Sequence, residues 1–291
     1  MIAIFSKTFD ERSASIIRNL LGILTRAGVD VLIYEPLSGF LTSLPEQSER
    51  VCGTFRCRDD LLPATRLLIS VGGDGTFLNS INIVRDSGIP VAGINIGRLG
   101  FLAHITEADL QESVEKLLAG VLPVEERTLI HATINGQPAN NFPYALNDVV
   151  IQRSAAGMIT IHTWSNDEFL NSYWADGLIV STPTGSSAYS LSVGGPIVAP
   201  ESQNFIISPI AAHNLNVRPL IIPDNVTLTL KTECRDKGRR FTLTLDSRSV
   251  GCTDGAEIEL KRADFKVRVV KSAPFYETLR NKLMWGVDKR N

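Results

Sequence analysis

The hydrophobic pattern of the chain changes its period near Val124, and this change constrains the fold more than any other feature. Before it, short apolar runs alternate with longer amphipathic runs, which is typical of a parallel sheet flanked by helices. After it, apolar and polar residues alternate with period two and β-branched residues are frequent, as in residues 241–246. We therefore predict an α/β, Rossmann-like domain over residues 1–123 and an all-β domain over residues 124–271.

Individual elements of the first domain follow from the same pattern. We predict strands at 2–5, 31–34, 67–71 and 90–95, and helices at 13–27, 76–85 and 108–118. A last helical pattern covers residues 276–285, and we expect this helix to return to the first domain, which residues 272–291 would complete. Residues 46–59 are polar and irregular, which predicts a surface loop.

Composition narrows the class of partner. The 291 residues are 44% hydrophobic and 21% charged, with a net charge of -2, which is ordinary for a globular protein and argues against nucleic acid as the main partner. No apolar run approaches the length that spans a bilayer, so we expect no membrane partner. The four cysteines lack C-x-x-C spacing and indicate free thiols in a reducing compartment, from which we predict a cytoplasmic protein.

A glycine turn directly follows the predicted strand 67–71. Gly72, Gly73 and Gly75 surround Asp74, and a helical pattern begins after them. Glycines let the main chain approach a ligand closely, and a helix N-terminus offers unpaired N–H groups to phosphate oxygens. The Asp74 carboxylate could accept the proton of a substrate hydroxyl during phosphoryl transfer. The alternative is a plain glycine turn in which Asp74 caps the next helix.

Three further segments carry polar groups suited to a ligand. Residues 95–102 form a second glycine loop, in which Arg98 could meet a phosphate or could simply be solvated. Residues 176–190 join a strand to a run of small hydroxyl residues, which indicates either a close-fitting ligand surface, where Tyr189 could stack on a base, or a structural corner. Asn147-Asp148 precedes a strand and suits ribose hydroxyls, although such a dipeptide is also an ordinary strand cap.

Together these segments closely resemble the NAD kinase family in its compact bacterial form. The resemblance is carried by V-G-G-D-G-T-F-L at 71–78, N-I-G-R-L-G-F-L at 95–102, L-N-D-V-V at 146–150 and D-G-L-I-V-S-T-P-T-G-S-S-A-Y at 176–189. The last segment is highly specific, whereas the GGDG element is shared with lipid kinases and, more loosely, with phosphofructokinases.

The resemblance implies transfer of the γ-phosphoryl group of ATP to the 2′-hydroxyl of the adenosine ribose of NAD, with a divalent cation, Mg²⁺ or Mn²⁺. It makes Asp74 the general base. The cofactor-binding set that we predict comprises Gly73, Asp74 and Gly75 in the glycine turn, Asn147 and Asp148 for the adenosine part, Asp176 for the nicotinamide end, Ser187, Ala188 and Tyr189 for the adenine region, and Thr184 and Ser192 beside them. A homodimer or homotetramer is expected, in which a neighbouring subunit often completes the NAD site.

Some positions depart from the family pattern, and two other functions stay open. Trp174 stands where many bacterial relatives carry a basic residue, and Arg248 ends a D-S-R triplet where relatives often read D-G-Q. His213 lies in a segment that lines the pocket in relatives, but a surface histidine is an equal alternative, so we leave it out of the predicted site. One alternative is a diacylglycerol-type lipid kinase, which shares the GGDGT loop, although the hydroxyl-rich segment argues against an apolar substrate. The other is a non-catalytic NADP(H) sensor, which an intact Asp74 makes improbable.

Overall fold

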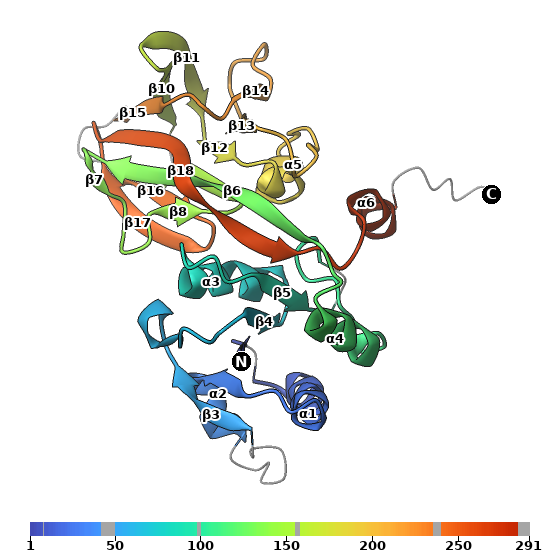
Figure 1. Cartoon of the computed structure of the whole chain (residues 1–291). Helices are drawn as coiled ribbons and strands as arrows, with labels where there is room; N and C mark the ends of the chain where they lie inside the picture. Colours follow the sequence, from blue (N-terminus) through green and yellow to red (C-terminus); the bar gives the residue numbers. More distant parts are fainter. Residues whose placement is uncertain (8, 42–49, 98–99, 155–157, 235–239, 285–291) are drawn as a thin grey trace, which may run out of the picture. The chain divides into compact units, whose positions relative to one another are not determined.

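The computed structural model describes residues 1–7, 9–41, 50–97, 100–154, 158–234 and 240–284. The chain forms two compact units (Figure 1). One contains residues 1–126 together with the chain from residue 267 onward, and the other contains residues 127–266. Each unit has its own hydrophobic core, so each is described separately.

Five parallel strands form the centre of the first unit. They are β1 (Ile2–Phe5), β2 (Val31–Tyr34), β3 (Val51–Phe55), β4 (Leu67–Val71) and β5 (Val91–Ile94). Their order in the sheet is β3-β2-β1-β4-β5, with every neighbouring pair parallel. This order reverses between β1 and β4, and doubly wound sheets bind ligands beyond the carboxyl ends of the strands at such a switch point. Here, β4 leads directly into the glycine turn.

The described part of the first unit also contains helices. They are α1 (Glu11–Arg26), α2 (Glu35–Leu41), α3 (Asp74–Val84), α4 (Leu110–Ala119) and α6 (Phe275–Leu283). The start of α1 is set by a capping box, in which Asp10 Oδ1 accepts the Ser13 N–H at 2.7 Å. Helices α1 and α4 contact each other, and α3 lies against β4 and β5, as Figure 1 shows.

The second unit is built almost entirely from antiparallel strands. They are β6 (Val124–Ile134), β7 (Gln137–Pro138), β8 (Tyr144–Ala145), β9 (Asp148–Arg153), β10 (Ile159–Ser165), β11 (Glu168–Ala175), β12 (Gly177–Ser181), β13 (Asn204–Ile210), β14 (Leu220–Pro223), β15 (Leu228–Cys234), β16 (Arg240–Leu245), β17 (Arg248–Thr253) and β18 (Glu257–Val270), the first and last of which continue into the other unit. Two short helical segments, η3 (Thr184–Ser187) and α5 (Tyr189–Ser192), follow β12.

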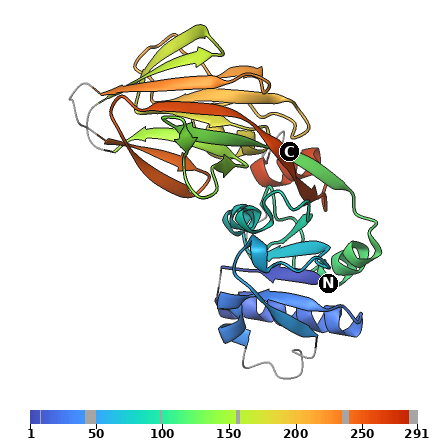
Figure 2. The same cartoon turned by 60° about the vertical axis from the view of Figure 1, so that its left-hand side comes forward.

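These strands form two layers, visible in the turned view of Figure 2. One sheet has the order β14-β13-β12-β9-β16-β17, and the other includes β11-β10-β15-β18. Buried side chains from both, such as Phe205 and Phe241 in the first and Ile161 and Leu230 in the second, belong to one core. The period-two alternation of this half reflects these layers, because every second residue of a strand points into the core.

The predicted fold class is confirmed, with local differences at individual elements. The surface loop predicted at 46–59 is wrong in its described part, because residues 51–55 form β3 and Arg58–Asp60 form a 3-10 turn, η2. The helix predicted from residue 76 begins two residues earlier, at Asp74. The C-terminal helix belongs to the first unit, as expected. Among the described residues, no helix is both long and apolar enough to cross a membrane.

Candidate functional site

The glycine turn after β4 brings the main chain close to the start of α3. A side chain at Gly72 would place its Cβ 2.4 Å from Thr76 Oγ1, so the turn can close only with glycine there. Gly73 and Gly75 are exposed, and a Cβ on either would meet nothing within 4 Å. The turn therefore has an open side, at which the N-terminal N–H groups of an 11-residue helix can receive phosphate oxygens.

The carboxylate of Asp74 is held by the second glycine loop. Its Oδ2 accepts the Phe101 N–H at 2.8 Å, and its Oδ1 accepts the N–H groups of Leu102 and Ala103 at 3.0 and 3.2 Å. Three main-chain donors compensate a negative charge and fix its direction. The helix-cap alternative for Asp74 is wrong, because Gly73 is the N-cap of α3 and the Asp74 side chain bonds to another loop.

Two more positions of this region require glycine, because neighbouring atoms lie too close to leave room for a Cβ atom. A Cβ on Gly100 would lie 2.0 Å from Asp74 Oδ1, and one on Gly93 would lie 2.6 Å from the Cα atom of Ala103. Within the same loop, Asn95 Oδ1 accepts the Gly97 N–H at 2.7 Å, which stabilises the local turn. The two glycine motifs are therefore one structure around the Asp74 carboxylate. Arg98, a possible phosphate ligand by sequence, lies outside the described residues.

Two lysines near the glycine turn were missed by sequence reasoning. Lys282 Nζ of α6 lies 3.5 Å from Asp74 Oδ2. Lys7, just after β1, donates to Asn79 Oδ1 of α3 at 2.8 Å. No local motif marks either lysine, because each reaches this place through the fold of the first unit. They supply positive charge at the switch point of the sheet, which suits an anionic ligand.

In the second unit, the Asn147-Asp148 dipeptide meets the hydroxyl-rich segment. Strands β9 and β12 are antiparallel neighbours, with Ser181 opposite Asp148. The Thr182 N–H donates to the Asn147 carbonyl at 2.9 Å. A Cβ on Gly185 would lie 2.0 Å from that same carbonyl oxygen, so the turn after β12 packs directly on the main chain of Asn147.

One polar atom at this end of β9 is left unsatisfied. Within the described part of the chain, the buried Asn147 Oδ1 has no hydrogen-bond partner. A buried acceptor without a donor costs free energy, which a ligand hydroxyl could offset after the amide rotates. The arrangement thus fits the predicted ribose contact.

The buried carboxyl group of Asp148 and the partly buried one of Asp246 lie next to Asn147. Asp246 accepts the N–H groups of Leu146, Asn147 and Asp148 at 3.0, 2.8 and 3.3 Å. Burial, with the nearby charge of Asp246 as a second cause, raises the pKa of Asp148 to about 7. Burial likewise raises the pKa of Asp246, against the lowering effect of these N–H groups. Sequence reasoning did not identify Asp246 as part of this site.

Asp176 is paired at the opposite end of the same strand pair. Arg153 Nε and Nη2 lie 2.7 and 3.2 Å from its two carboxylate oxygens, a bidentate pair that is about one-third exposed. Antiparallel pairing places Asp176 beside Arg153, five residues along β9 from Asp148. At about 3.4 Å per residue, this separates the predicted adenosine and nicotinamide residues by roughly 17 Å along the strands.

The hydroxyl-rich segment divides into structural and exposed residues. Ser186 Oγ exchanges hydrogen bonds with the main chain of Val198, and Ser190 Oγ lies 3.0 Å from Ser208 Oγ, so these two hydroxyls hold the corner together. Among the predicted ligands, Thr184 is buried, Ser187 and Ala188 are partly buried, and Tyr189 and Ser192 are exposed. The predicted ligand surface is therefore confined to the outer residues of the run.

The departures from the family pattern have local partners. The rings of Trp174 and His213 lie 6.3 Å apart, and the His213 N–H donates to the Trp174 carbonyl at 2.8 Å. The Arg248 guanidinium lies 5.1 Å from the Phe142 ring centroid and donates to the Tyr144 carbonyl. Its charge also lowers the pKa of Asp246, so Arg248 partly compensates a buried carboxylate.

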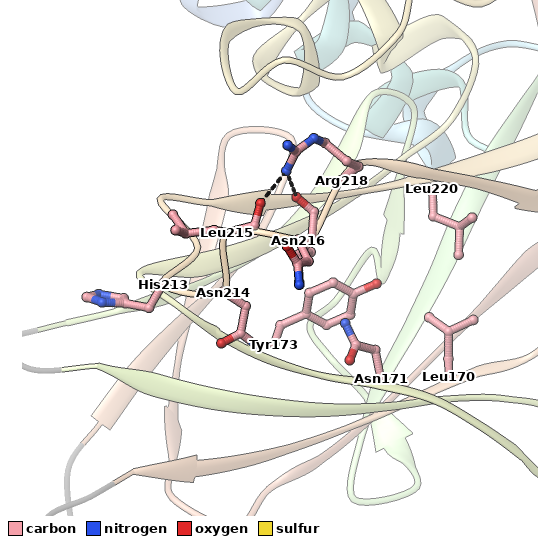
Figure 3. Close-up of a pocket in the computed structure, with 10 residues that line it drawn as sticks. Leu170, Asn171, Tyr173, His213, Asn214, Leu215, Asn216, Arg218 and Leu220 are labelled. Carbon is pink, nitrogen blue, oxygen red and sulfur yellow. Dashed lines mark hydrogen bonds between the residues drawn. The ribbon is translucent and has the colours of Figure 1, made fainter.

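A cavity of about 740 Å³ lies beside this region of the second unit (Figure 3). It is lined by residues of β11 and of the segment that follows β13, namely Leu170, Asn171, Tyr173, Leu220 and the run from His213 to Arg218. Arg218 Nη1 donates to the carbonyls of Leu215 and Val217 at 2.6 and 2.8 Å, which shapes the loop. No residue of the predicted cofactor-binding set lines this cavity.

Two family models match the chain. The model described as ATP-NAD kinase N-terminal domain matches residues 2–122. The model described as ATP-NAD kinase C-terminal domain matches residues 146–272. The first match contains the glycine turn and the loop that holds Asp74, and the second contains the strand pair β9–β12 with Asn147 and Asp176.

Individual proteins are similar over the whole chain. The NAD kinase of Cytophaga hutchinsonii is 41% identical over 294 residues, covering 100% of both chains, and that of Flavobacterium psychrophilum is 40% identical, covering 100% of this chain and 99% of the relative. Among solved structures, yeast NADH kinase complexed with NADH has a TM-score of 0.88 at 21% identity, covering 99% of this chain and 88% of that one. An NAD kinase from Archaeoglobus fulgidus in complex with ATP has a TM-score of 0.76 at 24% identity, covering 97% and 98%. At these identities the structures establish the fold.

Proposed function

The chain belongs to the NAD kinase family and phosphorylates NAD, and on this premise we propose that Asp74 is the general base of the reaction. The main support for this role is the fixed position of the Asp74 carboxylate at the switch point of the sheet. Three main-chain N–H groups hold it there, beside the open start of α3. A carboxylate in this place can take the proton of the 2′-hydroxyl as the γ-phosphoryl group arrives. Fixed orientation and charge compensation supply most of the rate in this type of transfer.

We assign the two substrates to different groups. The N–H groups at Gly73 and Gly75, with the charge of Lys7, suit the phosphates of ATP. The unsatisfied Asn147 Oδ1, with Asp148, suits ribose hydroxyls of NAD. The exposed Tyr189 offers a ring face for the adenine, beside Thr184, Ser187, Ala188 and Ser192. The solved relatives bound to NADH and to ATP support these two substrates.

The divalent cation is assigned to the substrate rather than to a protein site. Among the described residues, no group of three or more His, Cys, Asp or Glu side chains is placed to hold a metal ion. Mg²⁺ commonly binds through substrate phosphates and waters with few protein ligands, and Mn²⁺ accepts similar oxygen ligands. When bound to ATP, such a cation would neutralise phosphate charge.

We further propose that the protein is a homodimer or homotetramer. Asp176 lies roughly 17 Å along the strands from Asp148, at about 3.4 Å per residue. The resemblance leads us to expect a site in which a neighbouring copy supplies part of the NAD-binding residues, and Asp176 is the candidate that we assign to this role. Cytoplasmic residence remains a prediction, supported by the free thiols of Cys52, Cys57 and Cys252.

Product formation tests the function. We expect the purified protein, given NAD, ATP and Mg²⁺, to form NADP that an NADP-specific dehydrogenase can reduce, with a 2′-phosphate signal in the ³¹P spectrum. A short-chain diacylglycerol should not be phosphorylated in a parallel reaction. Polyphosphate in place of ATP would define the donor range. Binding of NADP(H) without any NADP formation would contradict the proposal and favour a sensor.

A further inference from the structure

Lys282 contacts the Asp74 carboxylate from the last helix of the chain. Its Nζ lies 3.5 Å from Asp74 Oδ2, which is long for a hydrogen bond, so the interaction is mainly electrostatic. The same Nζ lies 4.4 Å from the centroid of the Phe101 ring, within the range of a cation–π contact. Phe101 also donates its N–H to Oδ2, so Lys282 and Phe101 contact the same oxygen.

The position of Lys282 on α6 follows from how this helix packs. Thr278 and Leu279 are the buried residues of α6, and Lys282 lies four and three residues after them, on the same face. Arg280, in the same turn, is exposed. The packing of the apolar face of α6 thus carries Lys282 to Asp74, although the two residues are 208 positions apart in sequence.

The hydrogen-bond acceptor positions of the Asp74 carboxylate indicate what Lys282 does there. A carboxylate has about four lone-pair positions; two main-chain N–H groups bind Oδ1 and one binds Oδ2, which leaves about one position, on the oxygen that Lys282 Nζ approaches to 3.5 Å. A substrate hydroxyl that gives its proton to Oδ2 therefore enters the space beside the Lys282 ammonium. The N–H groups belong to a folded loop at 2.8–3.2 Å, whereas Lys282 is a side chain at 3.5 Å whose surface is 31% exposed, so it can move most easily.

We propose that Lys282 is a positioning residue for phosphoryl transfer, which orients Asp74 and balances its charge until the acceptor hydroxyl takes its place. This inference rests on the proposed role of Asp74 as the base. Because Lys282 acts through Asp74, it should affect turnover more than NAD binding. An ammonium has three donors, so Lys282 can remain near the reacting groups after it is displaced.

The test compares Lys282→Met with the matched control Arg280→Met, which removes a cation from the same helical turn. We expect Lys282→Met to lower kcat about tenfold, equivalent to about 1.4 kcal/mol, with the KM for NAD within about threefold. Lys282→Arg should recover most of this loss, and Arg280→Met should match the wild type. If Lys282→Met does not fold, Lys282→Gln replaces it.

A double-mutant cycle with Asp74→Asn tests whether the loss of activity in Lys282→Met depends on Asp74. If Lys282 works through Asp74, then adding Lys282→Met to Asp74→Asn should cost little further activity. An equal loss in both backgrounds, or a Lys282→Met enzyme as active as Arg280→Met, would overturn the inference and leave the role of Asp74 intact. Full activity of Asp74→Asn alone would instead refute the proposed function itself.

Discussion

At the scale of single residues, the local sequence around Asp74 predicts part of its environment but not the contacts that hold its carboxylate. The local sequence predicts a carboxylate at the end of a buried strand, beside a helix start. It does not reveal that the main chain of residues 101–103 would hold both oxygens, because that contact forms between distant segments. The choice between a helix cap and a positioned base therefore required the structure.

Gly100 provides a test that leaves Asp74 unchanged. In Gly100→Ala the new Cβ would lie 2.0 Å from Asp74 Oδ1, so the carboxylate must move. We expect kcat to fall about 10- to 100-fold, since misplacement by about 1 Å can cost that much. In the control, Gly97→Ala, the nearest atom is at 3.9 Å, and activity should stay within about twofold. Equal activity of the two variants would show that the loop does not orient Asp74.

Asp148 predicts a dependence of stability on pH. Its pKa rises from 3.8 to about 7 on folding, so the folded protein binds more protons than the unfolded chain between these values. Stability contributed by this group is therefore present at low pH and decreases as the pH rises from 4 to 7. Relative to the wild type, Asp148→Asn should gain free energy of unfolding as the pH rises from 5 to 8, by up to about 4 kcal/mol at roughly 1.4 kcal/mol per pKa unit, and its Tm should rise accordingly.

Thermal melts without NAD measure this effect, with Asp167→Asn as a surface control. Asp167 is exposed in the turn between β10 and β11, so its removal should give a melting curve parallel to the wild type at every pH. Parallel curves for Asp148→Asn as well would contradict a raised pKa at this position.

At the scale of elements, local pattern predicted α1, α3, α4 and α6 and four of the five parallel strands of the first unit. The helix at 13–27 was found at 11–26, because apolar residues at helical spacing dominate its burial and Asp10 caps it. Strand β3 was missed because it is an edge strand with only Val51 and Phe55 as large apolar residues. Its pairing with β2, rather than its own composition, makes it a strand.

The turn after β12 gives an element-scale prediction. In Gly185→Ala, the Cβ would lie 2.0 Å from the Asn147 carbonyl oxygen, which is main chain and cannot easily retreat. We expect the free energy of unfolding to fall by about 1–3 kcal/mol, as for other overpacked positions. In Gly251→Ala, a Cβ meets nothing within 4 Å, and chemical denaturation should show almost no change. A Gly185→Ala protein as stable as this control would show that the turn can open.

At the scale of the whole molecule, the parts of the site that escaped sequence reasoning are those set by long-range contacts. Lys282 reaches Asp74 from 208 residues away, and Asp246 binds the main chain of Leu146 from 100 residues away. Arg153 pairs with Asp176 only because β9 and β12 are neighbours. Lys282 and Arg153 belong to no motif, and Asp246 was noted only as the first residue of the D-S-R triplet, so their contacts could be found only once the chain is folded.

Subunit mixing tests the proposed oligomer. Asn147→Ala and Asp176→Ala should each be weakly active at low NAD concentration. If the two side chains of one site come from different copies, mixed dimers contain one intact site, and random mixing restores about a quarter of the wild-type rate. No recovery beyond the sum of the two variants, or a monomeric mass by light scattering, would contradict the proposal.

Transfer of the ribose hydroxyl proton to Asp74 is tested by the turnover of Asp74→Asn with NAD, ATP and Mg²⁺. The amide keeps the size of the side chain but is a poor proton acceptor. We predict that kcat falls about 10²- to 10⁴-fold while the Kd for NAD stays near the wild-type value and the Tm falls only slightly, because the amide nitrogen cannot accept a main-chain N–H. Turnover at the wild-type rate would contradict the account.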